Sequence, residues 1–393
     1  MYEICIIGGG AAGMAAALSI SMENPKLKIL LIEKKEKLGK KLAATGNGKC
    51  NISNNVLPSF GDTSRFFKSI GVEIKIDEEG RAYPVAEQAS EVVKALENAV
   101  RAYGVEVLTN SEVTDLRYDE EEGFEIAVGD VVYKAEHVVL ATGGKSAPQF
   151  GTTGDGYRFA KKLGHRVNRL APALVPVECE NSLLREMAGV RAKGKVTLYR
   201  HGFHVEEEEG EIQFTKDGLS GICLFNLSSY LVLNDKTQFS DYIIEIDLLN
   251  RYSDMEIVHI LKKRREIRNF KTEDLMMTIV NNKLTGKLLK QWSDKKEFAS
   301  MVTDEEILEI VNAFRHVTYQ VNGAKGWKEA QCTRGGVDWD DFDWETYESK
   351  ICKGLYIVGE VVDYNGPCGG YNLENAWNTA RKAGKAICTE YMK

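Results

Sequence analysis

The chain opens with a short apolar segment that runs into glycines and then into an alanine-rich stretch, "YEICIIGGGAAGMAAALSISME". Residues 2–7 are apolar and partly β-branched, which predicts a buried parallel strand. The glycines satisfy G-x-G-x-x-G, and the residues after them favour a helix to about residue 22. A second apolar segment, "KILLIEK" at 28–34, predicts the next strand. This order restricts the N-terminal part to a βαβ unit of an α/β fold.

Each part of this unit has a physical reason. Gly8 allows the tight turn, Gly10 lets the backbone approach a pyrophosphate, and Gly13 lets the helix pack closely on the strand. The helix N-terminus offers free N–H groups and partial positive charge to phosphates. Glu33 follows Gly13 by about 20 residues, where a carboxylate can accept hydrogen bonds from ribose hydroxyls. The sequence therefore predicts a dinucleotide site, without deciding between FAD and NAD.

Three other segments bear on that choice. "EHVVLATGG" at 136–144 favours a strand that ends in a turn, either an ordinary one or one that returns to the dinucleotide. The segment 353–387 predicts a buried strand, a glycine-rich loop and a helix that opens at "GGYN", which suits an anion or a flavin edge. "TGNGKCN" at 45–51 favours a loop in which glycines permit close approach and asparagines donate and accept hydrogen bonds. No second G-x-G-x-x-G occurs, which argues against two dinucleotide-binding Rossmann domains.

Composition narrows the class of protein. The net charge of −7 argues mildly against a general nucleic-acid binder. Eight cysteines without a C-x-x-C pair suit a reducing cytoplasm with mostly buried thiols, and predict neither a disulfide framework nor a metal site. The first residues lack the basic region of a signal peptide, and no stretch approaches the roughly 18 apolar residues of a membrane span. We therefore expect a cytoplasmic protein without a membrane partner, whose oligomeric state the sequence does not reveal.

Four segments together resemble the HI0933-like flavoproteins, a family related to the glutathione-reductase-type FAD fold. They are "IIGGGAAGMAAA", "GKKLAATGNGKCNISN", "ATGGKSAPQFGTTGDGYRFAKKLGH" and "CTRGGVDW" with "ESKICKGLYIVGEVVDYNGPCGGYNLENAW". They extend from Gly8 to Trp377, and the second and fourth are specific to the family. The resemblance implies an α/β protein with a Rossmann-like FAD-binding domain, interrupted by an inserted β-barrel and helical domain.

The expected FAD-binding segments are 1–190 and 321–393, with the insert at 191–320. Alternating apolar and polar residues around 194–221 predict β-hairpins, with the acidic residues 206–209 as a solvated hairpin tip. Apolar residues three and four apart predict helices over 254–316. A basic cluster at 261–271, "LKKRREIRNFK", is either a solvated helix face or a contact to a phosphate backbone.

Carried over by position, the resemblance implies non-covalent FAD and the residues that hold it. The pyrophosphate would lie at Gly8, Gly10, Ala12 and Gly13, the ribose at Glu33 and the adenine at the Val113 backbone. The flavin side would be lined by Thr45, Gly46, Asn47, Gly48 and Asn51, with Ala141, Thr142 and Gly143 nearby. Gly359, Glu360, Gly370, Asn372 and Leu373 would surround the ribityl chain and the isoalloxazine ring. Lys34 and Lys41 complete the cofactor set.

The flavin would carry the redox step, with NADH or NADPH as the expected electron donor. The resemblance implies reduction of an activated C=C bond conjugated to a carbonyl. The substrate is either a 3-oxo-Δ4 steroid or bile-acid-like small molecule, or uridine in large-subunit ribosomal RNA. A flavin-binding redox sensor without turnover is a further interpretation.

Several side chains are candidates for proton transfer. Cys368 and Tyr371, beside the flavin loop, are the first candidates, with packing of the loop as the alternative role. Cys332 and Arg334 are second candidates, and Arg334 could instead neutralise charge on flavin or substrate. Cys50 is expected to be a small buried packing residue. His165 is expected to end a helix and to lie outside the catalytic site. The candidates for proton transfer are therefore Cys368, Tyr371, Cys332 and Arg334.

Overall fold

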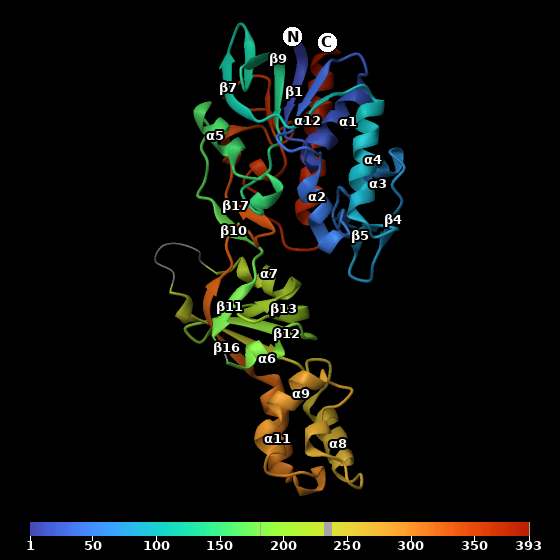
Figure 1. The fold of residues 1–393 in the computed structure, drawn as a ribbon, viewed down its shortest axis with the longest axis vertical. Coiled ribbons are helices and arrows are strands. Elements are labelled where there is room, and N and C mark those ends of the chain that lie inside the picture. The colour runs from blue at the N-terminus through green and yellow to red at the C-terminus, as the bar shows by residue number, and fades with distance from the viewer. Residues whose placement is uncertain (181, 232–237, 393) are drawn as a thin grey trace. The chain divides into compact units, whose positions relative to one another are not determined.

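The computed structural model describes residues 1–180, 182–231 and 238–392. The chain divides into two compact units, one formed by Met1–Ala173 with Trp327–Lys393 and the other by Leu174–Gly326 (Figure 1). The second unit extends beyond the expected insert, 191–320, at both ends. The reason is that β11 (Val177–Glu180) and β16 (Val317–Ala324) pair with each other and close its barrel.

The first unit is built on a seven-stranded sheet in the order β6-β2-β1-β9-β8-β7, with β18 also paired to β9. Strands β6, β2, β1, β9 and β18 are mutually parallel, while β8 and β7 continue the sheet as an antiparallel hairpin. Because β1 has a partner on each side, Ile4, Cys5 and Ile6 are fully buried. The strands are β1 (Tyr2–Ile7), β2 (Ile29–Ile32), β6 (Glu106–Leu108), β7 (Val113–Asp119), β8 (Gly123–Val128), β9 (Val131–Leu140) and β18 (Leu355–Ile357).

Two helices from opposite ends of the chain lie side by side in this unit, α1 (Ala11–Glu23) and α12 (Tyr371–Glu390) (Figure 1). Their contact is close because a methyl group at Gly384 would lie 2.8 Å from the Ser19 Cβ. The glycine therefore allows the C-terminal helix to pack directly against the helix that follows the glycine turn. The unit's other helices are α2 (Lys40–Ala44), α3 (Phe60–Ser69), α4 (Ala89–Ala102) and α5 (Asp155–Lys162).

Two small sheets complete the first unit. One has the order β3-β5-β4, from β3 (Ser53–Asn54), β4 (Ile74–Ile76) and β5 (Arg81–Pro84). The other pairs β10 (Ala171–Ala173) with β17 (Cys332–Arg334), and Ala173 lies opposite Cys332. The chain thus leaves for the second unit and returns from it through two neighbouring antiparallel strands.

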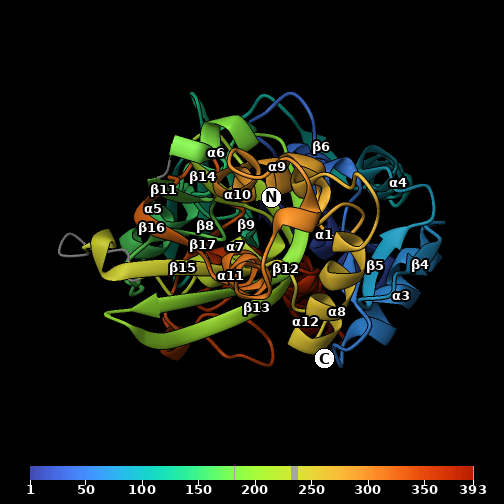
Figure 2. The same ribbon diagram turned by 90° about the horizontal axis from the view of Figure 1, so that it is seen from below.

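The second unit combines a closed barrel, in the order β11-β14-β13-β12-β15-β16, with helices. Its other strands are β12 (Arg191–Arg200), β13 (Phe203–Phe214), β14 (Gly218–Ser220) and β15 (Tyr242–Asp247). Figure 2 shows the long hairpin of β12 and β13 beside β15. Its helices are α6 (Ser182–Met187), α7 (Ile222–Ser228), α8 (Asp254–Arg265), α9 (Asn282–Leu288), α10 (Lys290–Ser293) and α11 (Asp304–Arg315).

The tip of the β12–β13 hairpin is not where the sequence predicted it. The acidic residues 206–209 lie within β13 and pair with β12. The turn is formed by His201 and Gly202, with φ values of 51° and 81°. Two successive residues at positive φ match a type I′ turn, whose twist fits that of the flanking strands. The sequence signal was therefore the His-Gly pair and not the run of charge.

Local sequence explains where two helices of the second unit begin. Ser253 and Glu256 form a capping box at α8, and Thr303 and Glu306 form one at α11. Asp304 pairs with Lys262 at 2.6 Å, which joins the start of α11 to the end of α8. Of the helices in the residues described, none has the length and apolar character needed to cross a membrane.

Candidate functional site

The turn from β1 into α1 tests whether the glycines fit a dinucleotide. Gly8 has φ +108°, and a methyl group there would lie 2.5 Å from the Ala141 carbonyl oxygen. A methyl group at Gly13 would lie 1.8 Å from the Gly8 carbonyl oxygen. At Gly10, in contrast, a methyl group would meet no atom within 4 Å. Gly8 and Gly13 are thus required for packing, while Gly10 borders open space, as the approach of a pyrophosphate demands.

The N-terminus of α1 suits a negatively charged ligand. No side chain caps it, and its first turn contains no acidic residue. Unpaired helix amides and the helix dipole together favour phosphate oxygens. The residues present therefore fit the pyrophosphate of a dinucleotide.

Glu33 is held beside this turn. Its carboxylate accepts from the Gly9 amide and from the Lys35 amide, both at 2.8 Å. Backbone hydrogen bonds also tie Glu33 to the segment that leads to β7, through Leu108 O at 2.8 Å and Ser111 N at 3.0 Å. Val113, the first residue of β7, therefore follows closely on the strand end that carries Glu33. This is the arrangement expected for adenosine contacts.

The N-terminal part of a second helix, α12, lies near the first turn of α1. Gly359 opens the 3₁₀ turn η7 (Gly359–Val361), and a methyl group there would lie 2.8 Å from the Ala12 Cβ and 3.9 Å from the Ala376 Cβ. The first turn of α1 and the second turn of α12 therefore both lie beside Gly359. Gly370 is the N-cap of α12, with φ +100° and no capping side chain. Leu373 lies in the first turn of that helix.

The loop 45–51 has an unusual backbone. Gly46, Asn47, Gly48 and Cys50 all have positive φ values, between 54° and 83°. For a residue with a side chain, this region costs roughly 1–2 kcal/mol. Gly46 and Asn47 carry exposed backbone, whereas Cys50 is fully buried in the core, and burial raises the pKa of its thiol to about 12. The burial of Cys50 favours a packing role for this residue.

A partly buried polar network joins Lys41, Glu360 and Ser146. The Lys41 ammonium donates to the Glu360 carboxylate at 2.8 Å and to the Ser146 hydroxyl at 2.6 Å. Ser146 donates to Glu360 at 2.8 Å, and so does the Thr333 backbone amide. Burial by itself raises the pKa of Glu360, but the Lys41 charge and these hydrogen bonds outweigh it, so that the pKa lies below its ordinary value. Glu360 is an ionised, fixed acceptor.

Sequence reasoning missed Ser146 and Thr333. The Thr333 hydroxyl accepts from the amides of Lys145 and Ser146 at 2.8 and 3.1 Å, which fixes the loop after Gly144. Both residues lie in motifs that carried the family resemblance, "ATGGKSAP" and "CTRGG". Their spacing along the chain gives no sign that they converge on Glu360.

The other predicted residues divide into two groups. Ala141, Thr142 and Gly143 follow β9 and lie beside the glycine turn, since Gly8 approaches both Ala141 and Thr142. Lys34 instead points to α5, where it pairs with Asp155 at 2.5 Å. Asn372 uses its amide to close the loop before it, accepting from Gly366 N at 2.9 Å and donating to Gly366 O at 2.8 Å. Lys34 and Asn372 therefore have structural partners of their own.

The proton-transfer candidates lie at different depths. Tyr371 is the first residue of α12, and its ring approaches Gly369. Cys368 is half-buried in the same loop. Cys332 is buried in β17, and burial raises the pKa of its thiol, which favours a packing role. Arg334 lies two residues further along β17, opposite Ala171.

His165 follows α5 and contacts Ala160 O at 3.1 Å and the Ser349 hydroxyl at 2.7 Å, so its position at the helix end is as expected.

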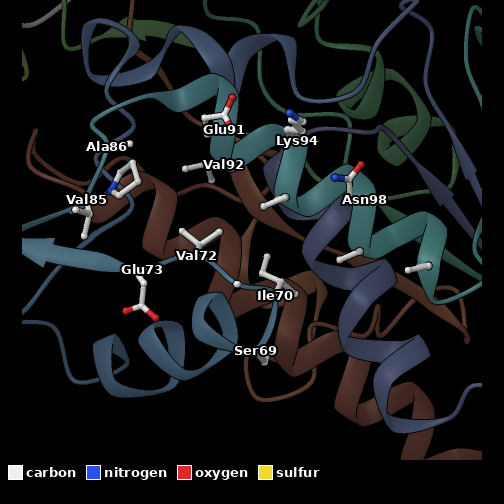
Figure 3. Close-up of a pocket in the computed structure, with 15 residues that line it drawn as sticks. Ser69, Ile70, Val72, Glu73, Val85, Ala86, Glu91, Val92, Lys94 and Asn98 are labelled. Carbon is white, nitrogen blue, oxygen red and sulfur yellow. The ribbon is translucent and has the colours of Figure 1, made fainter.

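A pocket of about 740 Å³ lies elsewhere in the first unit, between α3, α4 and the β4–β5 hairpin. Figure 3 shows its apolar floor, with Ile70, Val72 and Val92, and polar residues Glu73, Glu91 and Lys94 around it. None of the predicted cofactor residues lines it. Within the described residues, no cluster of three or more His, Cys, Asp or Glu is arranged to hold a metal.

A parallel sheet, a glycine turn with open space at Gly10 and two uncapped helix N-termini define a Rossmann-type dinucleotide-binding protein with an inserted barrel. The family described as HI0933-like protein Rossmann domain matches residues 2–60 and 59–386. The chain belongs to this HI0933-like family. The membership and the fold class expected from the sequence are thereby confirmed.

Two proteins of similar sequence and one of similar fold can be compared with this chain. The chain is 31% identical to a 3-dehydro-bile acid delta(4,6)-reductase from Clostridium scindens, over 98% of this chain and 99% of that protein. It is 27% identical to a ribosomal RNA dihydrouridine synthase from Haemophilus influenzae, over 96% of each. In fold it resembles a 3-ketosteroid-delta4-(5alpha)-dehydrogenase from Rhodococcus jostii, with a TM-score of 0.54, 13% identity, and coverage of 98% of this chain and 96% of that one.

Proposed function

We propose that the protein is an FAD-dependent oxidoreductase that reduces a C=C bond conjugated to a carbonyl in a small, steroid-like molecule. The observation that carries the cofactor is the glycine turn, where Gly10 borders open space at an uncapped helix N-terminus. The 31% identity to a bile-acid reductase over nearly the whole of both chains supports the substrate class.

The chain's residues would divide the work of binding. The α1 N-terminus and Gly10 would hold the pyrophosphate, and Glu33 the ribose. The ionised Glu360, fixed by Lys41 and Ser146, would accept from hydroxyls of the ribityl chain. The loop 45–51 and the α12 N-terminus would contact the flavin ring. When bound, FAD supplies hydride transfer.

Reduction of an enone also needs a proton and a donor to the carbonyl oxygen. The hydride adds to the β-carbon, and a proton must reach the α-carbon. Tyr371 can carry that proton on its hydroxyl, since it begins the helix whose N-terminus meets the flavin site. Cys368 is the alternative donor. NADH or NADPH would supply the hydride that restores the reduced cofactor.

Ribosomal RNA is the second candidate substrate, supported by the relative from Haemophilus influenzae. The basic cluster at the end of α8 gives less support to an RNA substrate than its sequence alone suggested. Lys262 and Arg265 pair with Asp304 at 2.6 Å, and Arg264 donates to the Leu275 carbonyl at 2.6 Å. These three basic side chains therefore already have partners within the second unit. A cytoplasmic location stays a prediction.

Three measurements test the proposal. The purified protein should show the near-ultraviolet and blue absorption bands of bound flavin; their absence from protein supplied with FAD would overturn the cofactor. Anaerobic addition of NADH or of NADPH should bleach the bands, and bands that neither compound bleaches would remove NAD(P)H as the electron donor. The reduced protein should then be reoxidised by a 3-oxo-Δ4 steroid. Reoxidation by a uridine-containing ribosomal RNA fragment, and not by the steroid, would identify the second substrate.

A further inference from the structure

The loop 45–51 holds non-glycine residues at positive φ, and such a backbone persists only where its surroundings fix it. Within the loop, the Cys50 amide donates to Thr45 O at 3.1 Å. The stronger attachment follows the loop, where residues 51–54 meet the first turns of α12. This attachment decides where the loop stands relative to that helix N-terminus.

Four contacts make the attachment. With its amide in the orientation that satisfies both ends, Asn51 accepts from the Gly370 amide at 3.1 Å and donates to Ser53 O at 2.9 Å. The Trp377 indole donates to Ile52 O at 2.9 Å. Two more contacts complete the set: Ser53 donates from its hydroxyl to Glu374 at 2.6 Å, and Asn54 donates from its amide to Gly369 O at 3.2 Å. A methyl group at Gly370 would lie 2.3 Å from Ser53 O, so the two segments are in direct contact.

Glu374 is the charged member of this set and is buried, with 3% of its surface exposed. Besides Ser53 it accepts from the Thr63 hydroxyl of α3 at 2.7 Å. Arg381 lies about two turns further along α12. Its guanidinium is 3.7 Å from the Glu374 carboxylate and donates to the Thr63 hydroxyl at 2.9 Å. A buried carboxylate is tolerated only when charge and hydrogen bonds compensate it, and here both are supplied.

From these contacts we infer that Glu374 is a positioning residue for the flavin. It makes no contact with the proposed cofactor residues of the glycine turn, but through Ser53 it sets the loop 45–51 against the N-terminus of α12. Both segments belong to the proposed flavin side of the site, so this inference rests on the proposed FAD site. Thr63 binds the same carboxylate but joins it to α3, away from the loop.

The two hydroxyls give a matched pair of variants. Ser53→Ala and Thr63→Ala each remove one hydrogen bond to Glu374, but only Ser53→Ala weakens the attachment of the loop to α12. Thr63→Ala also removes the acceptor of Arg381, so it is the more severe change to the network around Glu374. The holoenzymes are stripped of flavin and titrated with FAD, following flavin fluorescence. We expect Ser53→Ala to bind FAD about tenfold more weakly than wild type, and Thr63→Ala to stay within about threefold of it. Equal FAD affinities for the two variants would overturn the inference.

Glu374→Gln tests the charge. The substitution removes a buried negative charge from the first turn of α12, on the proposed flavin side, so the flavin midpoint potential should rise, and the vibronic shape of the visible band should change. Glu91→Gln is the control, because Glu91 is an exposed first-turn acid of α4. An unchanged potential and spectrum in Glu374→Gln, even with a lower unfolding temperature, would show a merely structural role. A wild-type protein that binds no FAD would instead refute the proposed function.

Discussion

The Lys41 ammonium lies 2.8 Å from the Glu360 carboxylate, although 319 residues separate the two along the chain. Lys41 comes from the short helix before the loop 45–51, and Glu360 from the turn that follows β18. The pair therefore joins the N-terminal and C-terminal segments of the first unit at the proposed cofactor site. Each partner compensates the other's half-buried charge.

Lys41→Met should destabilise the protein, because it leaves the half-buried Glu360 carboxylate without its counter-charge. We expect the free energy of unfolding to fall by about 1–2 kcal/mol at neutral pH. Urea denaturation followed by far-ultraviolet circular dichroism measures it. Lys40→Met is the matched control, since Lys40 pairs with the exposed Glu36 in the segment that precedes α2. If both variants are equally stable, the pair contributes nothing to the fold.

The same pair predicts a pH dependence. Because the folded-state pKa of Glu360 lies below its ordinary 4.5, its stabilisation is fully present above about pH 4.5 and is lost as the pH falls through the lower, folded value. In Lys41→Met, burial without the ammonium should raise the pKa of Glu360. The free energy of unfolding of this variant should therefore be lowered most at neutral pH. The stability gap between wild type and Lys41→Met should narrow between pH 7 and pH 4. A gap that stays constant over that range would contradict the assignment.

The glycine turn predicts opposite outcomes for two alanine substitutions. Gly10→Ala should fold normally, because its methyl group meets open space, yet bind FAD at least about tenfold more weakly. Gly13→Ala should fail to fold properly, because its methyl group would overlap the Gly8 carbonyl oxygen. Thermal unfolding of the flavin-free proteins separates the two effects. Wild-type FAD affinity in Gly10→Ala would place the pyrophosphate elsewhere.

Cysteine alkylation should distinguish the loop cysteines. Cys50 is fully buried and burial raises its thiol pKa to about 12, so it should resist iodoacetamide at pH 8. Cys368 is half-buried and should be modified first. Peptide mass spectrometry of the native protein after brief labelling reports both. Labelling of Cys50 before Cys368 would show that the loop 45–51 opens readily in solution.

Tyr371→Phe tests the proton donor. We expect turnover of an enone substrate to fall about 100-fold, the usual contribution of a general acid, while reduction of the flavin by NADH or NADPH keeps its wild-type rate. Stopped-flow absorbance measures the two half-reactions separately. Tyr364→Phe, in the preceding loop, is the control. A large loss in Cys368→Ser but none in Tyr371→Phe would assign the proton to the cysteine.

The βαβ unit was predictable because its signals are local. Gly8, Gly10 and Gly13 must follow a strand directly, and Glu33 must end the next one, so spacing alone defines the geometry. The polar network was not predictable, because Lys41, Ser146 and Glu360 come from three distant segments. The position of Glu374 against Ser53 depends in the same way on how α12 returns to the loop.

The bounds of the second unit escaped prediction for a related reason. β11 belongs to the barrel only through its pairing with β14 and β16, and its four residues carry no pattern that distinguishes them from the strands of the first unit. The hairpin tip was missed because the charge at 206–209 is more conspicuous than the His201–Gly202 pair that turns the chain.

The antiparallel pair β10–β17 has an evolutionary consequence. Because Ala173 lies opposite Cys332, the two points where the nucleotide-binding unit is interrupted are neighbours in space. A short linker could span them, and so could a foreign domain whose ends are close together. The unit that carries the glycine turn can therefore keep its core while the inserted segment is exchanged or remodelled.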